Sequence, residues 1–317
     1  MSRINELRLM ARLAQMYHGE GRVQADIAQH LRISQATVSR MLRRAVEEGI
    51  VRTIVSPPPG TYGDLEEGLR QTYELPEAIV VECTEDRDAA IMVRIGEAAA
   101  HFLEVTLQEG EVIGVSSWSQ TILRMVENLH PIKAGRARAV VQTLGGLGPT
   151  GAQAHATQLT MRLAQLVGAE PKLLPAPGVA QSREARLVLL GDPYVREATE
   201  LWGSVTLNIQ GVGALRPSDL LAGSGNVFSA TELEELARLG AVGNMSLRFF
   251  DRNGQPVRTP LDDRVIGMTL DEMRNVSRVM ALAGGQAKTE AIAGALRTGV
   301  VGVLVTDRFT AERLLKR

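Results

Sequence analysis

Short apolar runs alternate with amphipathic segments from residue 65 to the end of this 317-residue chain. The runs have the length of buried strands, and apolar residues recur between them at helical spacing. The expected strands lie at 78–81, 112–115, 139–144, 172–174, 205–209, 279–283 and 300–305. The expected helices lie at 65–73, 90–107, 120–129, 154–167, 230–239, 269–275 and 288–296. Buried strands that alternate with helices form a parallel sheet covered on both faces. The sequence therefore predicts a large, doubly wound α/β domain.

A proline run separates this region from the N-terminal part of the chain. Residues 56–60 read Ser-Pro-Pro-Pro-Gly, which can continue neither a helix nor a sheet because proline lacks a backbone N–H. We expect a first domain at 1–56, a linker at 57–64 and a second domain at 65–317. Two domains fit the length, since single domains typically have about 100–200 residues.

Charge and cysteine content limit the classes of function. The formal net charge is −1, but residues 1–56 hold nine arginines and five acidic residues, as expected of a segment that meets a polyanion. A lone Cys83 excludes an intramolecular disulfide and a thiolate zinc cluster. No stretch resembles a secretion signal or the roughly 18 apolar residues of a membrane span. We expect a cytoplasmic protein that does not contact a membrane.

The N-terminal region has the pattern of a helix-turn-helix. Apolar residues recur at helical spacing in 4–17, 24–30 and 35–48. Ser34 is suited to cap the third helix, and Gly49 is suited to end it. The β-branched residues of 49–55 predict a strand or wing after the third helix. A winged helix-turn-helix is therefore expected before the linker.

The third helix carries side chains that suit the major groove of DNA. Glutamine can pair with adenine and arginine with guanine near the N-terminus of a recognition helix. The expected DNA-binding residues are Ser34, Gln35, Ala36, Thr37, Ser39, Arg40, Arg43 and Arg44. Ser34, Ser39, Arg40 and Arg44 could equally hold phosphates without reading sequence. A helical bundle for dimerisation is the alternative, but the short turn, the excess of arginine and the wing together favour double-stranded operator DNA.

A series of short motifs runs through the chain. In order, they are Ile27-Ala28, Ile33-Ser34, Val38-Ser39-Arg40-Met41-Leu42, Glu47-Glu48-Gly49-Ile50-Val51, Leu144-Gly145-Gly146-Leu147-Gly148, Leu174-Pro175-Ala176-Pro177, Gly211-Val212-Gly213, Arg248-Phe249-Phe250-Asp251-Arg252-Asn253-Gly254 and Ala283-Gly284-Gly285-Gln286-Ala287-Lys288. By their order and spacing the chain resembles the SorC family of sugar-binding transcriptional regulators. The resemblance implies a second domain shaped like ribose-phosphate isomerase and glucosamine-phosphate deaminase, used for sensing. It also implies a homodimer or homotetramer whose operator affinity changes when a phosphorylated sugar binds.

Three loops that follow expected strands are candidates for the effector site, because open α/β sheets bind ligands at the carboxyl ends of their strands. The first loop carries the hydroxyls of Ser116, Ser117, Ser119 and Thr121, which suit an anionic oxygen. In the second, Gly145 and Gly146 allow a close approach of the backbone. The third places Lys288 at a helix start, where it matches the family's phosphate-contacting lysine. Its alternative role is that of a solvated surface lysine.

The resemblance adds further candidates and two departures from the family pattern. His155 and Thr157 align with pocket-lining positions of relatives, although a lone histidine at a helix start is often simply a satisfied core or surface group. Asn244 stands where the family often has an acidic residue facing a sugar hydroxyl. Serines flank Trp118 where relatives usually have glycines, and Trp118 is also a candidate core residue. These departures leave the identity of the effector open.

The candidate loops offer hydroxyls, amides and one lysine, but no carboxylate pair for acid–base chemistry. Asp251, Asp262 and Asp263 fall near an expected turn and are suited to form it. We therefore expect no catalytic residues, no cofactor and no bound metal. A sugar-phosphate isomerase or deaminase with a fused helical domain is the alternative, and a purely structural DNA-binding oligomer would not need the glycine-rich loops.

Overall fold

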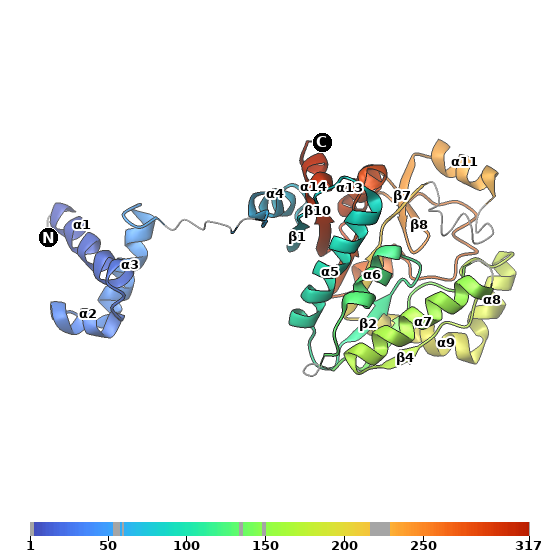
Figure 1. Cartoon of the computed structure of the whole chain (residues 1–317), viewed down its shortest axis with the longest axis horizontal. Coiled ribbons are helices and arrows are strands. Elements are labelled where there is room, and N and C mark those ends of the chain that lie inside the picture. The colour runs from blue at the N-terminus through green and yellow to red at the C-terminus, as the bar shows by residue number, and fades with distance from the viewer. Residues whose placement is uncertain are drawn as a thin grey trace. The chain divides into compact units, whose positions relative to one another are not determined.

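The computed structural model divides the chain into two compact units, Met1–Pro58 and Pro59–Arg317 (Figure 1). The structure describes residues 3–52, 58, 60–132, 136–147, 150–215 and 229–316, without the side chains of residues 150–152 and 155. Within these ranges, no helix combines the length and apolar character needed to cross a membrane. Each unit buries apolar side chains in a core of its own.

The first unit is a helical bundle around a small apolar core. It comprises α1 (Arg3–Ala14), a π-helical segment (Gln15–Gly19), α2 (Gln24–Leu31) and α3 (Gln35–Glu47). Its buried residues include Met10, Leu13, Ile27, Val38 and Leu42. Arg32 ends α2 in the left-handed conformation, and the Ser34 side chain accepts the Thr37 backbone N–H at 3.2 Å. These contacts confirm the predicted helix-turn-helix and the predicted cap.

The expected wing is not seen in the part of segment 49–55 that the structure describes. Gly49 has a φ of +71°, and the Val51 N–H donates to the Ala45 carbonyl at 2.9 Å. Residues 49–51 therefore fold back against the end of α3, and residues 49–52 form no strand. Residues 53–55 lie outside the described ranges.

The second unit is built on a seven-stranded, fully parallel sheet, as predicted. The strands are β1 (Glu77–Val81), β2 (Val112–Val115), β3 (Ala139–Gln142), β4 (Glu170–Lys172), β5 (Leu207–Gly211), β9 (Arg278–Leu282) and β10 (Val303–Asp307). Their order across the sheet is β1-β10-β9-β5-β2-β3-β4. The order determines which strand ends meet: Val81 pairs with Asp307 at one side, and Val115 pairs with Ile209 near the centre.

Helices cover both faces of this sheet. They are α4 (Gly63–Tyr73), α5 (Asp88–Thr106), α6 (Gln120–Asn128), α7 (Thr150–Val167), α8 (Arg183–Gly191), α9 (Pro193–Glu200), α12 (Leu270–Arg274), α13 (Thr289–Arg297) and α14 (Arg308–Leu315), while α11 (Ala230–Arg238) packs against β7 (Ala241–Met245) instead. Side chains from α5, α6 and α7 share one core cluster with one face of the strands, while α4, α9, α12, α13 and α14 contribute to the other. Successive strand residues alternate between the two, as Ile113 and Val112 do. Both faces are therefore buried, which explains the uninterrupted apolar runs.

A three-stranded antiparallel sheet, β6 (Gly213–Ala214), β7 (Ala241–Met245) and β8 (Arg248–Asp251), was not predicted. The β7–β8 turn uses Ser246 and Leu247 at φ values of +48° and +61°, where glycine or asparagine is the usual signal. This hairpin packs closely on α13. A Cβ at Gly243 would lie 2.5 Å from the Ala291 Cβ, and one at Gly254 would lie 2.3 Å from the Arg297 carbonyl carbon.

Candidate functional site

The N-terminal turn of α3 presents polar side chains at the surface of the first unit. Gln35, Ala36, Arg40 and Arg43 are exposed. Thr37 and Ser39 are half-buried, and the Ser34 and Thr37 hydroxyls lie 2.8 Å apart. The capping interaction therefore fixes the start of the helix, while the exposed residues remain accessible to a partner.

Arg44 is placed differently from the other expected DNA-binding residues. Its guanidinium forms an ion pair with Glu6 of α1 and lies 3.9 Å from a Glu48 oxygen. The hydrogen bond and charge of Arg44 lower the pKa of the Glu6 carboxyl. Arg44 thus joins α1 to α3 inside the unit, and we leave it out of the DNA-contacting set proposed below.

In the second unit, the order in which the chain adds strands to the sheet reverses between two neighbouring strands, β2 and β5. After β2 it continues to β3 and β4 on one side, and after β5 it continues to β9 and β10 on the other. Open α/β sheets bind ligands at such a switch point, beyond the carboxyl ends of the strands. The loops that meet there are 116–121 and 211–213. They approach closely, since a Cβ at Gly211 would lie 2.7 Å from the Ser119 Oγ.

The hydroxyls of the first loop are largely engaged inside the protein. Ser117 is buried, and its hydroxyl lies 2.8 Å from that of Thr160 on α7. Ser119 caps α6 by accepting the Ile122 N–H at 3.4 Å. Ser116 and Thr121 are buried as well. The loop therefore has a fixed conformation, with the exposed part of Ser119 at the switch point.

The two glycines of the second loop are packed against another part of the same chain. The Gly145 N–H donates to the Ile266 carbonyl at 3.0 Å, and the Gly146 N–H donates to the Ala176 carbonyl at 2.7 Å. A Cβ at Gly145 would lie 2.6 Å from the Ala176 oxygen. The group that approaches Gly145 closely is thus a segment of the same chain. The backbone N–H groups of Gly145 and Gly146 both donate to carbonyls within the protein.

A cavity of about 390 Å³ lies beside these glycines. Its lining includes Trp118, Gln142, Gly146, Thr157 and Pro177. Trp118 is both a core residue, with its Nε1–H donating to the Gly145 carbonyl at 3.1 Å, and a wall of the cavity. Gly146 and Thr157 are therefore brought together as predicted pocket residues, whereas the side chain of His155 lies outside the described part of the structure.

Lys288 lies at the end of a short 3-10 turn, Gln286–Lys288, directly before α13. Gly285 precedes the turn with a φ of +98° and donates its N–H to the Thr310 hydroxyl at 2.8 Å and to the buried Asp307 carboxylate at 3.3 Å. A Cβ on Gly285 would lie 2.4 Å from an Asp88 oxygen. Two carboxylates and a hydroxyl thus define the conformation of the loop that carries Lys288.

The Lys288 ammonium is half-buried, and it makes no hydrogen bond or ion pair with any residue that the structure describes. Burial lowers the pKa of Lys288, and the charge of Asp88 offsets this effect in part. Such an ammonium favours an anionic partner, because removing its hydration without pairing is unfavourable.

Strand β6 contacts both Asn244 and the turn that carries Lys288. Asn244 of β7 pairs with Gly213 of β6, and the turn Gln286–Lys288 also packs against β6. A Cβ at Gly213 would lie 2.7 Å from the Asn244 Nδ2. Of the predicted residues, Asn244 and Lys288 thus lie around β6, whereas Gly146 and Thr157 line the cavity.

Asp88, Gln142, Thr160 and Asp307 were not predicted from the sequence. Gln142 connects Thr160, at 3.2 Å from its Nε2, with the Leu174 N–H, at 2.8 Å from its Oε1. Asp307 is the last residue of β10 and caps α14, a position where an aspartate can be recognised from sequence. Asp88 has no comparable signal.

Comparison with known proteins agrees with both units. The family described as "Putative sugar-binding domain" matches residues 59–316, and the MarR family matches residues 13–60. A deoxyribonucleoside regulator of Bacillus subtilis (strain 168) is 30% identical over 302 residues, which cover 95% of each chain.

Two solved structures are similar over most of their length. The crystal structure of the full-length sorbitol operon regulator SorC from Klebsiella pneumoniae shares 28% identity and covers 97% of this chain and 98% of that one, with a TM-score of 0.72. The sugar-binding domain of the transcriptional regulator DeoR from Pseudomonas syringae pv. tomato shares 40% identity and covers 79% and 97%, with a TM-score of 0.63.

Proposed function

Because this chain belongs to the SorC family of sugar-binding transcriptional regulators, we propose that α3 binds operator DNA and that a phosphorylated sugar or polyol in the second unit controls this affinity. The protein acts as a homodimer or homotetramer, since one recognition helix reads only a few base pairs and paired half-sites add affinity. It is a sensor and carries out no reaction.

The DNA-binding half of the proposal is supported by the surface of α3. Gln35, Ala36, Arg40 and Arg43 are exposed on a helix whose opposite face is buried in the core. Ser34, Thr37 and Ser39 lie beside them at its N-terminal end. An exposed polar N-terminal turn on the second helix of a helix-turn-helix is the part that enters the major groove.

The observation that carries the effector half is the half-buried Lys288 ammonium, which forms no ion pair with any described residue although the charge of Asp88 acts on it. A phosphate group adds negative charge beside the ammonium and accepts hydrogen bonds from it. Asn244, Ser119 and Thr157 offer polar groups to the hydroxyls of a sugar or polyol. The charge of Lys288 therefore favours a phosphorylated ligand over a neutral one.

Two aspartates that follow Asn244 in the sequence have structural partners, which supports a sensing role. The Asp251 carboxylate accepts the Asn253 and Gln255 N–H groups, each at 2.8 Å. Asp262 accepts the Thr259 N–H at 3.0 Å and pairs with Arg248. Neither is placed as a free general base.

Operator binding in the presence of candidate ligands tests the proposed function. An operator is obtained by binding-site selection, and its affinity for the full chain is measured by fluorescence anisotropy. The ligands are the 6-phosphate of sorbitol and the 5-phosphate of deoxyribose, each beside its unphosphorylated form and inorganic phosphate. A phosphorylated ligand should shift the affinity and the neutral forms should not. A response to neutral sugars alone, or turnover of a phosphorylated sugar, would contradict the proposal.

We predict that Gln35→Ala relaxes base preference at one position of each half-site. The loss should be about 1–3 kcal/mol against the preferred base, as for other bidentate side chain–base contacts. Gln29→Ala is the matched control, because Gln29 is an exposed glutamine of α2 outside the proposed contact set. Binding-site selection with both variants checks the prediction. An unchanged preferred operator for Gln35→Ala would remove Gln35 from the base-reading set.

A further inference from the structure

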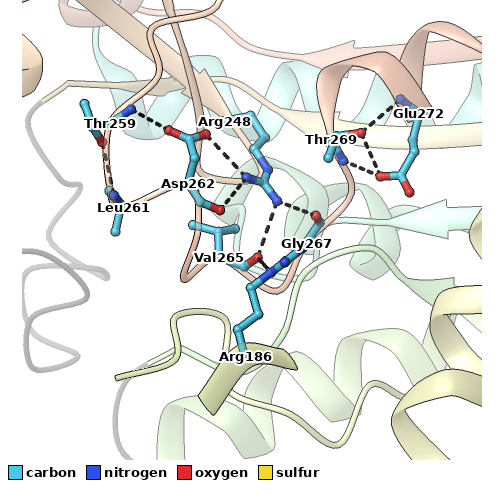
Figure 2. A network of polar contacts seen from close by, with 9 residues as sticks. All are labelled: Arg186, Arg248, Thr259, Leu261, Asp262, Val265, Gly267, Thr269 and Glu272. Carbon is cyan, nitrogen blue, oxygen red and sulfur yellow. Dashed lines mark hydrogen bonds and ion pairs between the residues drawn. The ribbon is translucent and has the colours of Figure 1, made fainter. Parts of the chain in front are cut away.

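A buried arginine, Arg248, does not line the cavity but hydrogen-bonds to a backbone segment that supports its lining. Arg248 on β8 is only 7% exposed. One terminal nitrogen donates to the Asp262 carbonyl and carboxylate at 3.2 and 3.3 Å, and the other donates to the carbonyls of Val265 and Gly267 at 3.4 and 2.9 Å. Figure 2 shows these bonds together with Arg186 of α8, whose Nε donates to the same Val265 carbonyl at 2.8 Å.

The segment 264–268, which these arginines hold, pairs with two stretches of backbone, one after the other along the same edge. Its residues bond to the chain just beyond β3: the Gly145 N–H donates to the Ile266 carbonyl and the Met268 N–H donates to the Thr143 carbonyl, at 3.0 and 2.8 Å. They also bond to a second stretch, where the Ile266 N–H donates to the Gly178 carbonyl at 2.8 Å. The carbonyls of residues 265 and 267 point away from both stretches, toward the guanidinium groups. The two arginine side chains therefore supply the hydrogen-bond donors that a neighbouring strand would otherwise offer to these carbonyls.

The same segment supports the lining of the cavity. Gly146 and Pro177 line it and form a bridge, and the Gly178 N–H donates to the Gly146 carbonyl at 2.6 Å. Each of these residues is next to one that bonds to segment 264–268. A displacement of that segment would therefore move the wall of the cavity without altering any lining side chain.

We propose that Arg248 is a positioning residue, which fixes the cavity wall at Gly146 and Pro177 through the carbonyls of Val265 and Gly267. The inference rests on the proposed function for its consequence, namely that the sugar part of a phosphorylated effector lies beside this wall. Only a planar fork of donors can reach Asp262 and both carbonyls at once, because a lysine ammonium is a single point of charge. Burial also lowers the pKa of the Arg248 guanidinium, in keeping with its removal from water.

The test compares Arg248→Lys with Arg278→Lys in the full chain. Arg278 is a matched control, because it is also partly buried and donates to one carbonyl, that of Thr106, and one carboxylate, that of Glu111. It lies at the first residue of β9, at the opposite end of the sheet from the cavity. Hydrogen exchange is followed in peptides covering 143–147 and 176–180. Affinity for the 6-phosphate of sorbitol and the 5-phosphate of deoxyribose is measured by calorimetry.

Arg248→Lys should speed exchange in both peptides roughly tenfold, because buried carbonyls left without donors favour local opening. It should also weaken binding of the sugar phosphate by about fivefold or more, while Arg278→Lys changes neither quantity. If Arg248→Lys does not fold, Asp262→Asn takes its place: this variant keeps the carbonyl bonds of Arg248 and should give the same two effects at a smaller size. Equal effects of the two arginine variants, or unchanged exchange in Arg248→Lys, would overturn the inference. If the unaltered protein bound neither sugar phosphate, the proposed effector class would fail, and the exchange comparison would still decide whether Arg248 fixes the wall.

Discussion

Lys288→Ala is expected to leave operator binding without effector nearly unchanged and to remove most of the influence of a phosphorylated effector. Losing a hydrogen-bonded charge pair with a phosphate should weaken effector affinity by about 1.5–3 kcal/mol, or roughly ten- to a hundredfold. A ligand can shift a conformational equilibrium only by its different affinities for the two states. The effect of the ligand on operator binding should therefore decrease as its affinity for the protein decreases. Operator affinity with and without effector, measured across effector concentrations, checks this expectation.

Two further variants sharpen the test of Lys288. Lys172→Ala is the matched control, because Lys172 forms ion pairs with Glu170 and Glu197 at 2.7 and 2.8 Å and lies on β4. Lys288→Arg should restore the response only in part, since a guanidinium replaces a compact ammonium. An effector response of Lys288→Ala at wild-type concentrations would place the anion site elsewhere.

The lowered pKa of Lys288 also predicts how effector binding depends on pH. The protonated ammonium binds phosphate, so affinity should fall as the pH rises through the pKa of Lys288 in the free protein. Because burial lowers this pKa, the decline should begin below the range of an ordinary lysine near 10.4. In Lys288→Arg the decline should be absent, because arginine stays charged.

A chain that begins at Pro59 is expected to lose operator binding by a factor of about a thousand or more, since specific contacts and nearly all of the cationic attraction to phosphates lie in the removed part. In the full chain, the logarithm of affinity should fall linearly with the logarithm of salt concentration. The motivation is the nine arginines against five acidic residues in 1–56. Gel-shift and salt-titration measurements on both chains test the expectation.

The shortened chain provides its own control for folding. The unit Pro59–Arg317 has two large core clusters of its own, and the solved DeoR domain from Pseudomonas syringae covers a comparable part of the chain. It should therefore melt cooperatively and keep its affinity for the effector. Undiminished DNA binding by this chain would refute the assignment of α3.

The sequence was most informative where local interactions decide the structure. Ser34 caps α3 because its hydroxyl reaches a backbone N–H three residues ahead, a short-range geometry that the chain encodes directly. The strand predicted at 112–115 is β2, because both of its faces are buried and every residue is therefore apolar or glycine. By contrast, α8 was missed because the exposed Leu187 and Val188 stand directly before Leu189 and Leu190, which pack against the core, so the apolar residues do not follow one helical face.

The candidate site was predictable only in part. Lys288 could be singled out from its place before a helix and from the resemblance to a family, but its half-burial and its carboxylate neighbours could not. Gly145 and Gly146 were predicted to allow a close approach of the backbone to the effector. The approaching group proved to be the backbone of Ala176, which lies some thirty residues farther along the chain.

By itself, then, the sequence determined the helix cap at Ser34, the buried strands and the parallel α/β class, because the apolar and capping patterns behind them extend over only a few residues. Tertiary structure alone decided the strand order β1-β10-β9-β5-β2-β3-β4, which brings loop 116–121 beside loop 211–213 and the Lys288 turn beside β6. It also decided that Arg248 supports the cavity wall from a hairpin that has no turn signal. These contacts join residues far apart in the chain, and they follow from how whole elements pack.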